Sequence, residues 1–136
     1  MKIESEKLNN QFDKDKIRSI FQDVIDGEFN IFDSEKMANY DADFSGDEPY
    51  IINIWSKQKG FGFGYIVFHD FLNRVGLDKT FISTNFTDEG SKLFDKAVSD
   101  GLIEKISEPF GLQQLTRWKV IGDPISHLKQ MKDLIK

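Results

Sequence analysis

The residues best suited to chemistry in this chain lie between positions 54 and 65, where glycines alternate with aromatic side chains. Gly60, Gly62 and Gly64 follow Lys59 in the run Lys-Gly-Phe-Gly-Phe-Gly-Tyr. Glycine adopts positive φ at little cost and lets main-chain N–H groups come close to a ligand. Where such a loop opens a helix, the bare N–H groups of the first turn attract an anion. The segment therefore predicts a phosphate-binding loop.

The same segment supports a second interpretation. Residues 59–63 coincide with the start of a motif whose aromatic rings stack on bases in RNA-recognition and cold-shock domains. The continuation departs from that motif, because Gly64 stands where a β-branched residue is expected and weakens a strand. A net charge of −5 also argues against a nucleic-acid partner. A purely structural glycine turn is a further alternative.

A strand and a helix must hold this loop in place. Tyr50 to Trp55 is apolar on both faces, with Ile52 and Ile54 on one side and Ile51 and Trp55 on the other, which predicts a central strand covered on both sides. After the loop, a helix is expected from near Gly62 to a glycine cap at Gly76. Its buried stripe comprises Tyr65, Val67, Phe68, Phe71, Leu72 and Val75.

The remaining pattern predicts one α/β or α+β domain over residues 1–136, with a mixed, mostly antiparallel central sheet flanked by helices. A helix is expected over 13–26, short strands over 29–32 and 37–44, and a strand over 80–84 that lies parallel to the one at 50–55. A further helix is expected from a cap at 87 to Gly101, with Leu93, Phe94, Ala97 and Val98 buried. Two antiparallel strands over 102–106 and 115–121 and a helix from Pro124 complete the pattern.

Composition limits the classes of function. The chain has no cysteine, which excludes disulfides, thiolate metal sites and a thiol nucleophile, and favours the cytoplasm. No apolar run approaches the about 20 residues that cross a bilayer, and residues 1–16 lack the pattern of a signal peptide. The two histidines, His69 and His127, are too isolated in sequence to predict a metal site, so no metal is expected.

Residues 50–121 resemble the GNAT-type N-acetyltransferases, especially short, divergent forms found in phage-like sequences. Lys59, Gly60, Phe61, Gly62, Phe63 and Gly64 match the family's basic residue, two spacers and Gly-x-Gly after its fourth strand. Asn85 just past the next strand, then Gly90, Leu93–Phe94 and Gly101, match the positions that follow. The resemblance implies a GNAT-like fold and acetyl-coenzyme A as the bound substrate.

What the resemblance implies for each residue is specific. Main-chain N–H groups of residues 60–65, ending at Tyr65, would receive the pyrophosphate. Strands near Ile54 and Phe81 would spread apart to admit the pantetheine arm. The N–H near Trp55 would polarise the thioester carbonyl. Asn85 would hydrogen-bond the pantetheine or a water molecule, and the acceptor would be an amine.

One departure from the family concerns proton transfer. Phe94 stands where the family often has a tyrosine that protonates the leaving thiolate, and phenylalanine cannot donate a proton. Glu48, Tyr50 and His69 are candidates for a general base by residue type only. A non-catalytic alternative therefore stays open, namely a small acidic protein of phage or immunity type that binds a partner protein.

Overall fold

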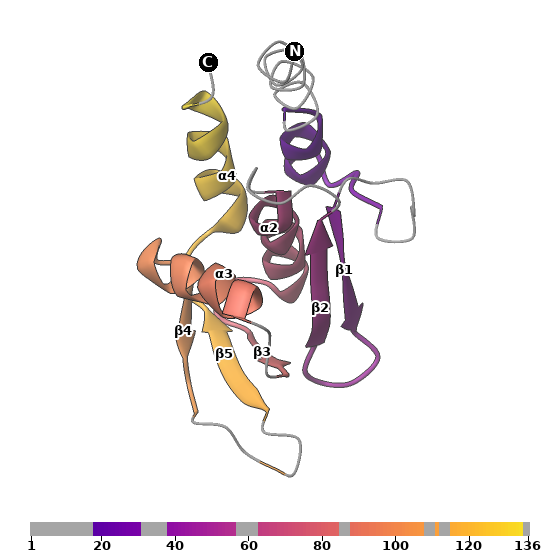
Figure 1. The fold of residues 1–136 in the computed structure, drawn as a ribbon, viewed down its shortest axis with the longest axis vertical. Helices are drawn as coiled ribbons and strands as arrows, with labels where there is room; N and C mark the ends of the chain where they lie inside the picture. Colours follow the sequence, from indigo (N-terminus) through magenta and orange to yellow (C-terminus); the bar gives the residue numbers. More distant parts are fainter. Residues whose placement is uncertain are drawn as a thin grey trace, which may run out of the picture.

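The protein is described by a computed structural model, which places residues 18–30, 38–56, 63–84, 88–107, 111 and 115–134. Residues 18–25 are helical and precede the sheet. The elements that follow, shown in Figure 1, are β1 (Ala38–Asp43), β2 (Tyr50–Ser56), α2 (Phe63–Val75), β3 (Thr80–Ser83), α3 (Asp88–Ser99), β4 (Ile103–Lys105), β5 (Thr116–Val120) and α4 (Pro124–Asp133).

The strands form one mixed sheet in the order β1-β2-β3-β5-β4. Only the β2–β3 pair is parallel, and the other three neighbouring pairs are antiparallel. The α2 helix makes the crossover between the two parallel strands, as a parallel pair requires. The predicted fold class is therefore confirmed: the chain is an α+β domain whose sheet is mixed and mostly antiparallel.

The pairing of β2 with β1 is interrupted by a β-bulge. Ala42 pairs with Ile51 but Asp41 pairs with Asn53, so Ile52 is an extra residue on β2. The bulge interrupts the alternation of faces, because Ile52 and Asn53 are both exposed after Ile51, which is 0% exposed. Ile54 packs against the core. The prediction that Ile52 and Ile54 share a face, and that the strand is covered on both sides, is therefore wrong at Ile52.

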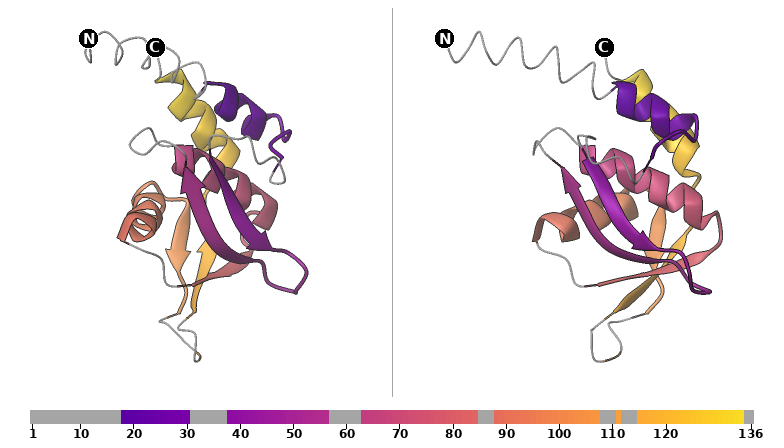
Figure 2. Two further views of the ribbon diagram at one scale, coloured as in Figure 1. Left: turned by 45° about the vertical axis from the view of Figure 1, so that its right-hand side comes forward. Right: turned by 90° about the vertical axis from the view of Figure 1, so that its right-hand side faces the viewer.

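The core is a cluster of aromatic rings on one face of the sheet. Phe81 of β3 and Trp118 of β5 are paired neighbours on that face. Phe68 of α2 stands edge-on to Phe81, with ring centroids 6.4 Å apart, and Phe94 of α3 lies 5.0 Å from Trp118. Because the rings of both helices reach these two strands, α2 and α3 cover the same face (Figure 2).

Helix positions follow from the apolar stripes that the sequence predicts. The α2 helix begins at Phe63 and ends before Gly76, whose φ of 101° only glycine adopts readily. Its predicted stripe is buried throughout. Two details are wrong: Val98 of α3 is 44% exposed, and Phe29 lies in no strand although it is buried.

A buried polar contact fastens α2 to β1. The Tyr40 hydroxyl donates to Asp70 Oδ2 over 2.6 Å, and Arg74 Nε donates to the same oxygen over 2.8 Å. The Arg74 guanidinium also donates to the carbonyl oxygen of Phe29. The helix that opens after the glycine segment is thus held in a fixed position against the β1–β2 pair.

Within the described ranges, none of the helices combines the length and apolar character needed to pass through a lipid bilayer.

Candidate functional site

The parallel strands β2 and β3 run together over a short distance. Their ladder consists of Tyr50 with Ile82 and Ile51 with Ser83. The β3 strand ends there, while β2 continues to its last residue paired with β1. Residues 53–55 of β2 accordingly have no strand partner on their β3 side among the described residues. The bulge at Ile52 falls where the two strands part.

The first turn of α2 lies directly against this part of β2. A Cβ placed on Gly64 would lie 3.6 Å from Ile54 Cγ2 and 3.5 Å from Leu93 Cδ1 of α3. The φ of Gly64 is not positive, so a left-handed conformation does not account for glycine at this position. The first turn of α2 contains no acidic residue. No carboxylate within that turn therefore compensates the positive end of the helix dipole.

The structure brings together some of the predicted coenzyme residues. Ile54 and Trp55 lie on the part of β2 that extends beyond β3, and Phe63, Gly64 and Tyr65 form the start of α2. The other predicted residues, namely Lys59, Gly60, Phe61, Gly62 and Asn85, lie outside the described residues.

The nucleic-acid interpretation requires Phe63 to present its ring on the surface of a strand. Phe63 instead begins a helix and is 1% exposed. A buried ring cannot stack on a base, so this residue does not have the role that the motif assigns to it.

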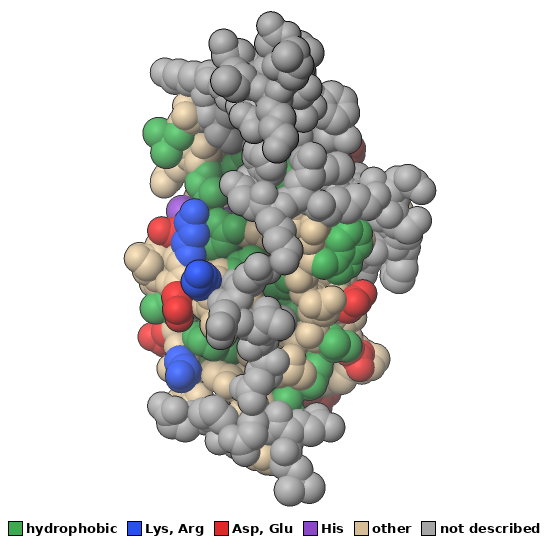
Figure 3. All heavy atoms as spheres, in the orientation of Figure 1, with side chains coloured by type: hydrophobic (Ala, Val, Ile, Leu, Met, Phe, Trp, Pro, Cys, Tyr) green, Lys and Arg blue, Asp and Glu red, His purple; other side chains and the backbone are tan. Residues whose placement is uncertain are grey.

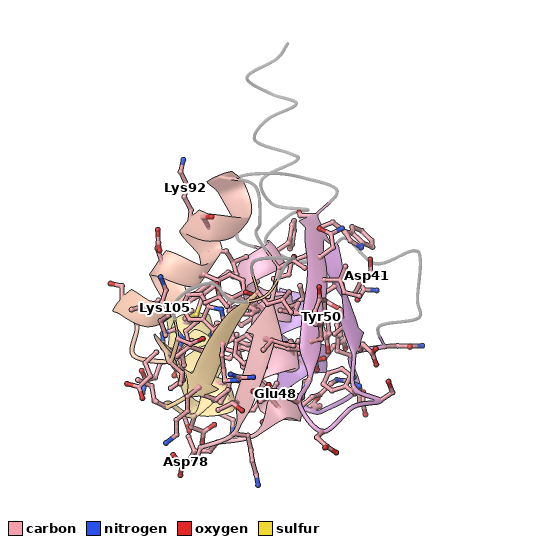
Figure 4. The ribbon with its side chains drawn as sticks, turned by 90° about the horizontal axis from the view of Figure 1, so that it is seen from below. Asp41, Glu48, Tyr50, Asp78, Lys92 and Lys105 are labelled. Carbon is pink, nitrogen blue, oxygen red and sulfur yellow. The ribbon has the colours of Figure 1, made fainter. Side chains whose placement is uncertain are left out.

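Glu48, one of the residues considered as a general base, is bound by two other side chains. Glu48, labelled in Figure 4, accepts hydrogen bonds from Arg117 and Thr80. The single hydrogen on Arg117 Nε is shared between both carboxylate oxygens, Nη2 donates to Oε1, and the Thr80 hydroxyl donates to Oε2 over 2.6 Å. The hydrogen bonds from Arg117 are the main reason why the pKa of Glu48 is lowered, which makes it a poor base. Phe94 is 3% exposed and packs in the core.

The two histidines, which are 58 positions apart in sequence, form a hydrogen-bonded pair in space. His69 Nε2 of α2 lies 2.8 Å from His127 Nδ1 of α4, and the rings are parallel within 1°. On the far side of His69, its Nδ1 lies 2.7 Å from the Tyr65 carbonyl oxygen. On the far side of His127, its Nε2 lies 3.6 Å from Asp100 Oδ2. The Tyr65 hydroxyl donates to that same Asp100 oxygen over 2.6 Å.

We name Tyr65, His69, Asp100 and His127 the histidine cluster. It begins in the protein interior, since His69 is 0% exposed, and reaches solvent at the half-buried side chains of Asp100 and His127. Figure 3 shows a histidine at the surface beside acidic and basic side chains. The sequence offers one signal: His69 follows Tyr65 by four residues, which puts both on the same side of the expected helix. Nothing in the sequence connects His69 to α4.

The histidine cluster does not have the geometry of a metal site. His69 and Asp100 face opposite nitrogens of the His127 ring, so one cation cannot contact all three side chains. Among the residues that the structure describes, there is no group of three or more His, Cys, Asp or Glu side chains placed to hold a metal ion.

Comparisons with family models, with curated proteins and with solved structures give no match to this chain.

Proposed function

We propose that the chain binds acetyl-coenzyme A between β2 and β3 and is an N-acetyltransferase-like protein that transfers the acetyl group to an amine. The observation that carries the proposal is the arrangement of one parallel strand pair. Its ladder ends after two residue pairs, β2 continues beyond it, and the connecting helix α2 begins beside the continued part. Such an arrangement offers main-chain groups of β2 to an extended, amide-containing ligand.

The proposed position of the coenzyme follows from what each part of it needs. The two amides of pantetheine need main-chain partners, and residues 53–55 of β2 would supply them. The ligand would then lie where a neighbouring strand would otherwise pair with β2. The pyrophosphate needs N–H donors and positive charge, for which the residues before and within the first turn of α2 are suited. We propose that Lys59 and residues 60–62 bind the pyrophosphate. Asn85 would bind the pantetheine.

The chemistry would depend mainly on positioning. Holding the thioester and the amine together supplies much of the rate in such reactions, and an N–H group near Trp55 would stabilise the charge that develops on the thioester oxygen. The ring of Phe94 offers no proton to the leaving thiolate, and Glu48 is paired with Arg117. We therefore expect acetyl transfer to be slow unless the acceptor amine or solvent protonates the leaving thiolate and accepts the proton of the amine.

The acceptor is proposed to be a cationic amine, because acidic residues are frequent just before β2. Asp41 and Asp43 lie on β1, and Asp47 and Glu48 lie in the turn that leads into β2. Asp41, Asp43 and Asp47 are exposed.

Tryptophan fluorescence offers a direct test, because the chain has two tryptophans in different surroundings. Trp55 is half-buried on the part of β2 that extends beyond β3, whereas Trp118 is 8% exposed in the core. Titration with acetyl-coenzyme A should change the emission of the wild type, and the change should be lost in Trp55→Phe. An unchanged response in Trp55→Phe would contradict the proposed position of the ligand.

A charge reversal tests the proposed phosphate site. Lys59→Glu should weaken acetyl-coenzyme A binding at least about tenfold, since one charge-assisted contact with a phosphate is replaced by repulsion. Lys129→Glu is the matched control, because it makes the same change of net charge at an exposed position on α4. Equal affinities of the two variants would remove Lys59 and its loop from the site.

A further inference from the structure

The positions of the protons in the histidine cluster are fixed by its outer neighbours. A carbonyl oxygen only accepts hydrogen bonds, so His69 Nδ1, at 2.7 Å from the Tyr65 carbonyl, must carry a hydrogen. Burial of the ring lowers the pKa of His69 to about 4, so the ring is neutral at pH 7. Its Nε2 is then an acceptor, and His127 Nδ1 at 2.8 Å must be the donor.

The pair can therefore take up one proton without losing a hydrogen bond. His127 Nε2, which faces Asp100, is the nitrogen without a hydrogen, and Nδ1 of the same ring donates to His69 in either state. A second proton has to go to His69 Nε2. Two N–H groups would then point at each other across 2.8 Å, and two positive charges would lie side by side.

The other charged groups around the pair act in opposite directions on a positive charge at His69. From α3, the Lys96 ammonium lies 4.8 Å from the centre of the Tyr65 ring and opposes a charge on His69, whereas Asp100 favours it. From α2, Tyr65 contributes a neutral hydroxyl, whose pKa is raised by burial and by its hydrogen bond to Asp100. The Asp100 carboxylate thus accepts from Tyr65 and faces His127 Nε2 at 3.6 Å.

Undocking of α4 would not break the hydrogen bonds of the sheet, because α4 follows the last strand. The α4 helix packs mainly on α2, and its Leu128 is 0% exposed in the core. A side-chain hydrogen bond from Lys132 to Gln22 joins it to the helical segment 18–25. Asp123 caps α4 by accepting from the N–H groups of Ile125 and Ser126. That cap belongs to the helix itself and would survive its release.

We propose that the His69–His127 pair is an acid-sensitive clasp, which holds α4 on α2 while His69 is neutral and releases α4 when the pair takes up its second proton. Release would expose the side of α2 that carries Tyr65 and His69. The clasp involves no coenzyme, so it can be tested independently of the proposed function.

Hydrogen exchange measured residue by residue by NMR between pH 7 and pH 4.5 tests the clasp, after correction for the intrinsic pH dependence of exchange. Protection of the α4 amides should fall at least about tenfold more than protection of the β5 amides. His69→Gln should abolish this difference, because the amide oxygen still accepts from His127 but does not titrate. Lys129→Gln on the exposed side of α4 is the control and should behave as the wild type. A parallel loss in α4 and β5, or a difference that persists in His69→Gln, would overturn the proposal.

A second measurement needs no variant and so does not depend on the folding of His69→Gln. The chain has two histidines, so only two sets of ring ¹⁵N signals have to be assigned. At pH 7, His69 should be neutral with its hydrogen on Nδ1, and it should still be neutral at pH 5. A hydrogen on Nε2 of His69, or protonation of His69 near pH 6.5, would refute the proton arrangement on which the clasp depends.

Discussion

Replacing Tyr40 by phenylalanine removes one buried hydroxyl between β1 and α2 and leaves the packing of the ring unchanged. The lost hydrogen bond runs to Asp70 Oδ2 over 2.6 Å, and Tyr40 and Asp70 are 1% and 4% exposed. Hydrogen bonds to charged groups contribute about 1.5–3 kcal/mol. Arg74 Nε still donates to the same oxygen over 2.8 Å, so the carboxylate keeps a partner. We therefore expect Tyr40→Phe to lower the free energy of unfolding by about 2 kcal/mol.

Urea denaturation at pH 7 measures this loss directly, and a thermal scan should show a decrease in Tm of roughly 6–8 °C. The slope of the denaturation curve should not change, because the buried surface is the same. Tyr50→Phe is the matched control: it removes the same hydroxyl group from a half-buried side chain on β2. Changes at such surface positions usually stay within about 0.5 kcal/mol.

A double-mutant cycle with Asp70→Asn isolates the interaction itself. Because Tyr40 and Asp70 are in direct contact, the two changes should be coupled by about 1–2 kcal/mol. A loss below about 0.5 kcal/mol in Tyr40→Phe, or additive effects in the cycle, would refute the claim that this hydrogen bond fastens α2 to the sheet.

Two other predictions concern close packing and an ion pair. Gly122→Ala should destabilise the fold by about 1–3 kcal/mol in urea denaturation, because the new Cβ would lie 2.5 Å from the Gly101 carbonyl oxygen; Gly46→Ala, which meets nothing within 4 Å, should change stability little. The pKa of Glu48 is lowered, chiefly by hydrogen bonds from Arg117, so its stabilising effect should be complete above the usual glutamate range and be lost as pH falls through the folded-state pKa. Glu48→Gln should flatten that acid-side decline in a pH series of denaturation curves, and an identical decline in both proteins would contradict the assignment.

Local patterns in the sequence were sufficient to predict most of the elements, although not the absence of a strand at Phe29. The apolar stripe between Phe63 and Val75 follows the helical period, and Gly76 supplies a C-terminal cap that only glycine forms readily, so the limits of α2 could be set within a residue. Trp118 and Val120 alternate with Arg117 and Lys119 as β5 requires. These features depend on residues close together in the chain.

Features that depend on pairing between distant residues could not be predicted. The bulge at Ile52 arises from the register of β2 against β1, and neither strand alone shows that one residue is extra. The contact between His69 and His127 depends on how α4 docks, which no local period reveals. Of the proposed coenzyme site, the placement of Ile54 beside Gly64 follows from the structure, whereas the roles of Lys59 and Asn85 stay predictions from sequence.

The central claim is that this chain binds acetyl-coenzyme A where β2 extends beyond β3. Isothermal titration calorimetry of the wild type with acetyl-coenzyme A tests it most directly, with adenosine and free pantetheine as partial ligands. We predict one site per chain with a dissociation constant below about 0.1 mM, and weaker binding of either fragment. Absence of binding heat at millimolar acetyl-coenzyme A, at two temperatures, would contradict the claim.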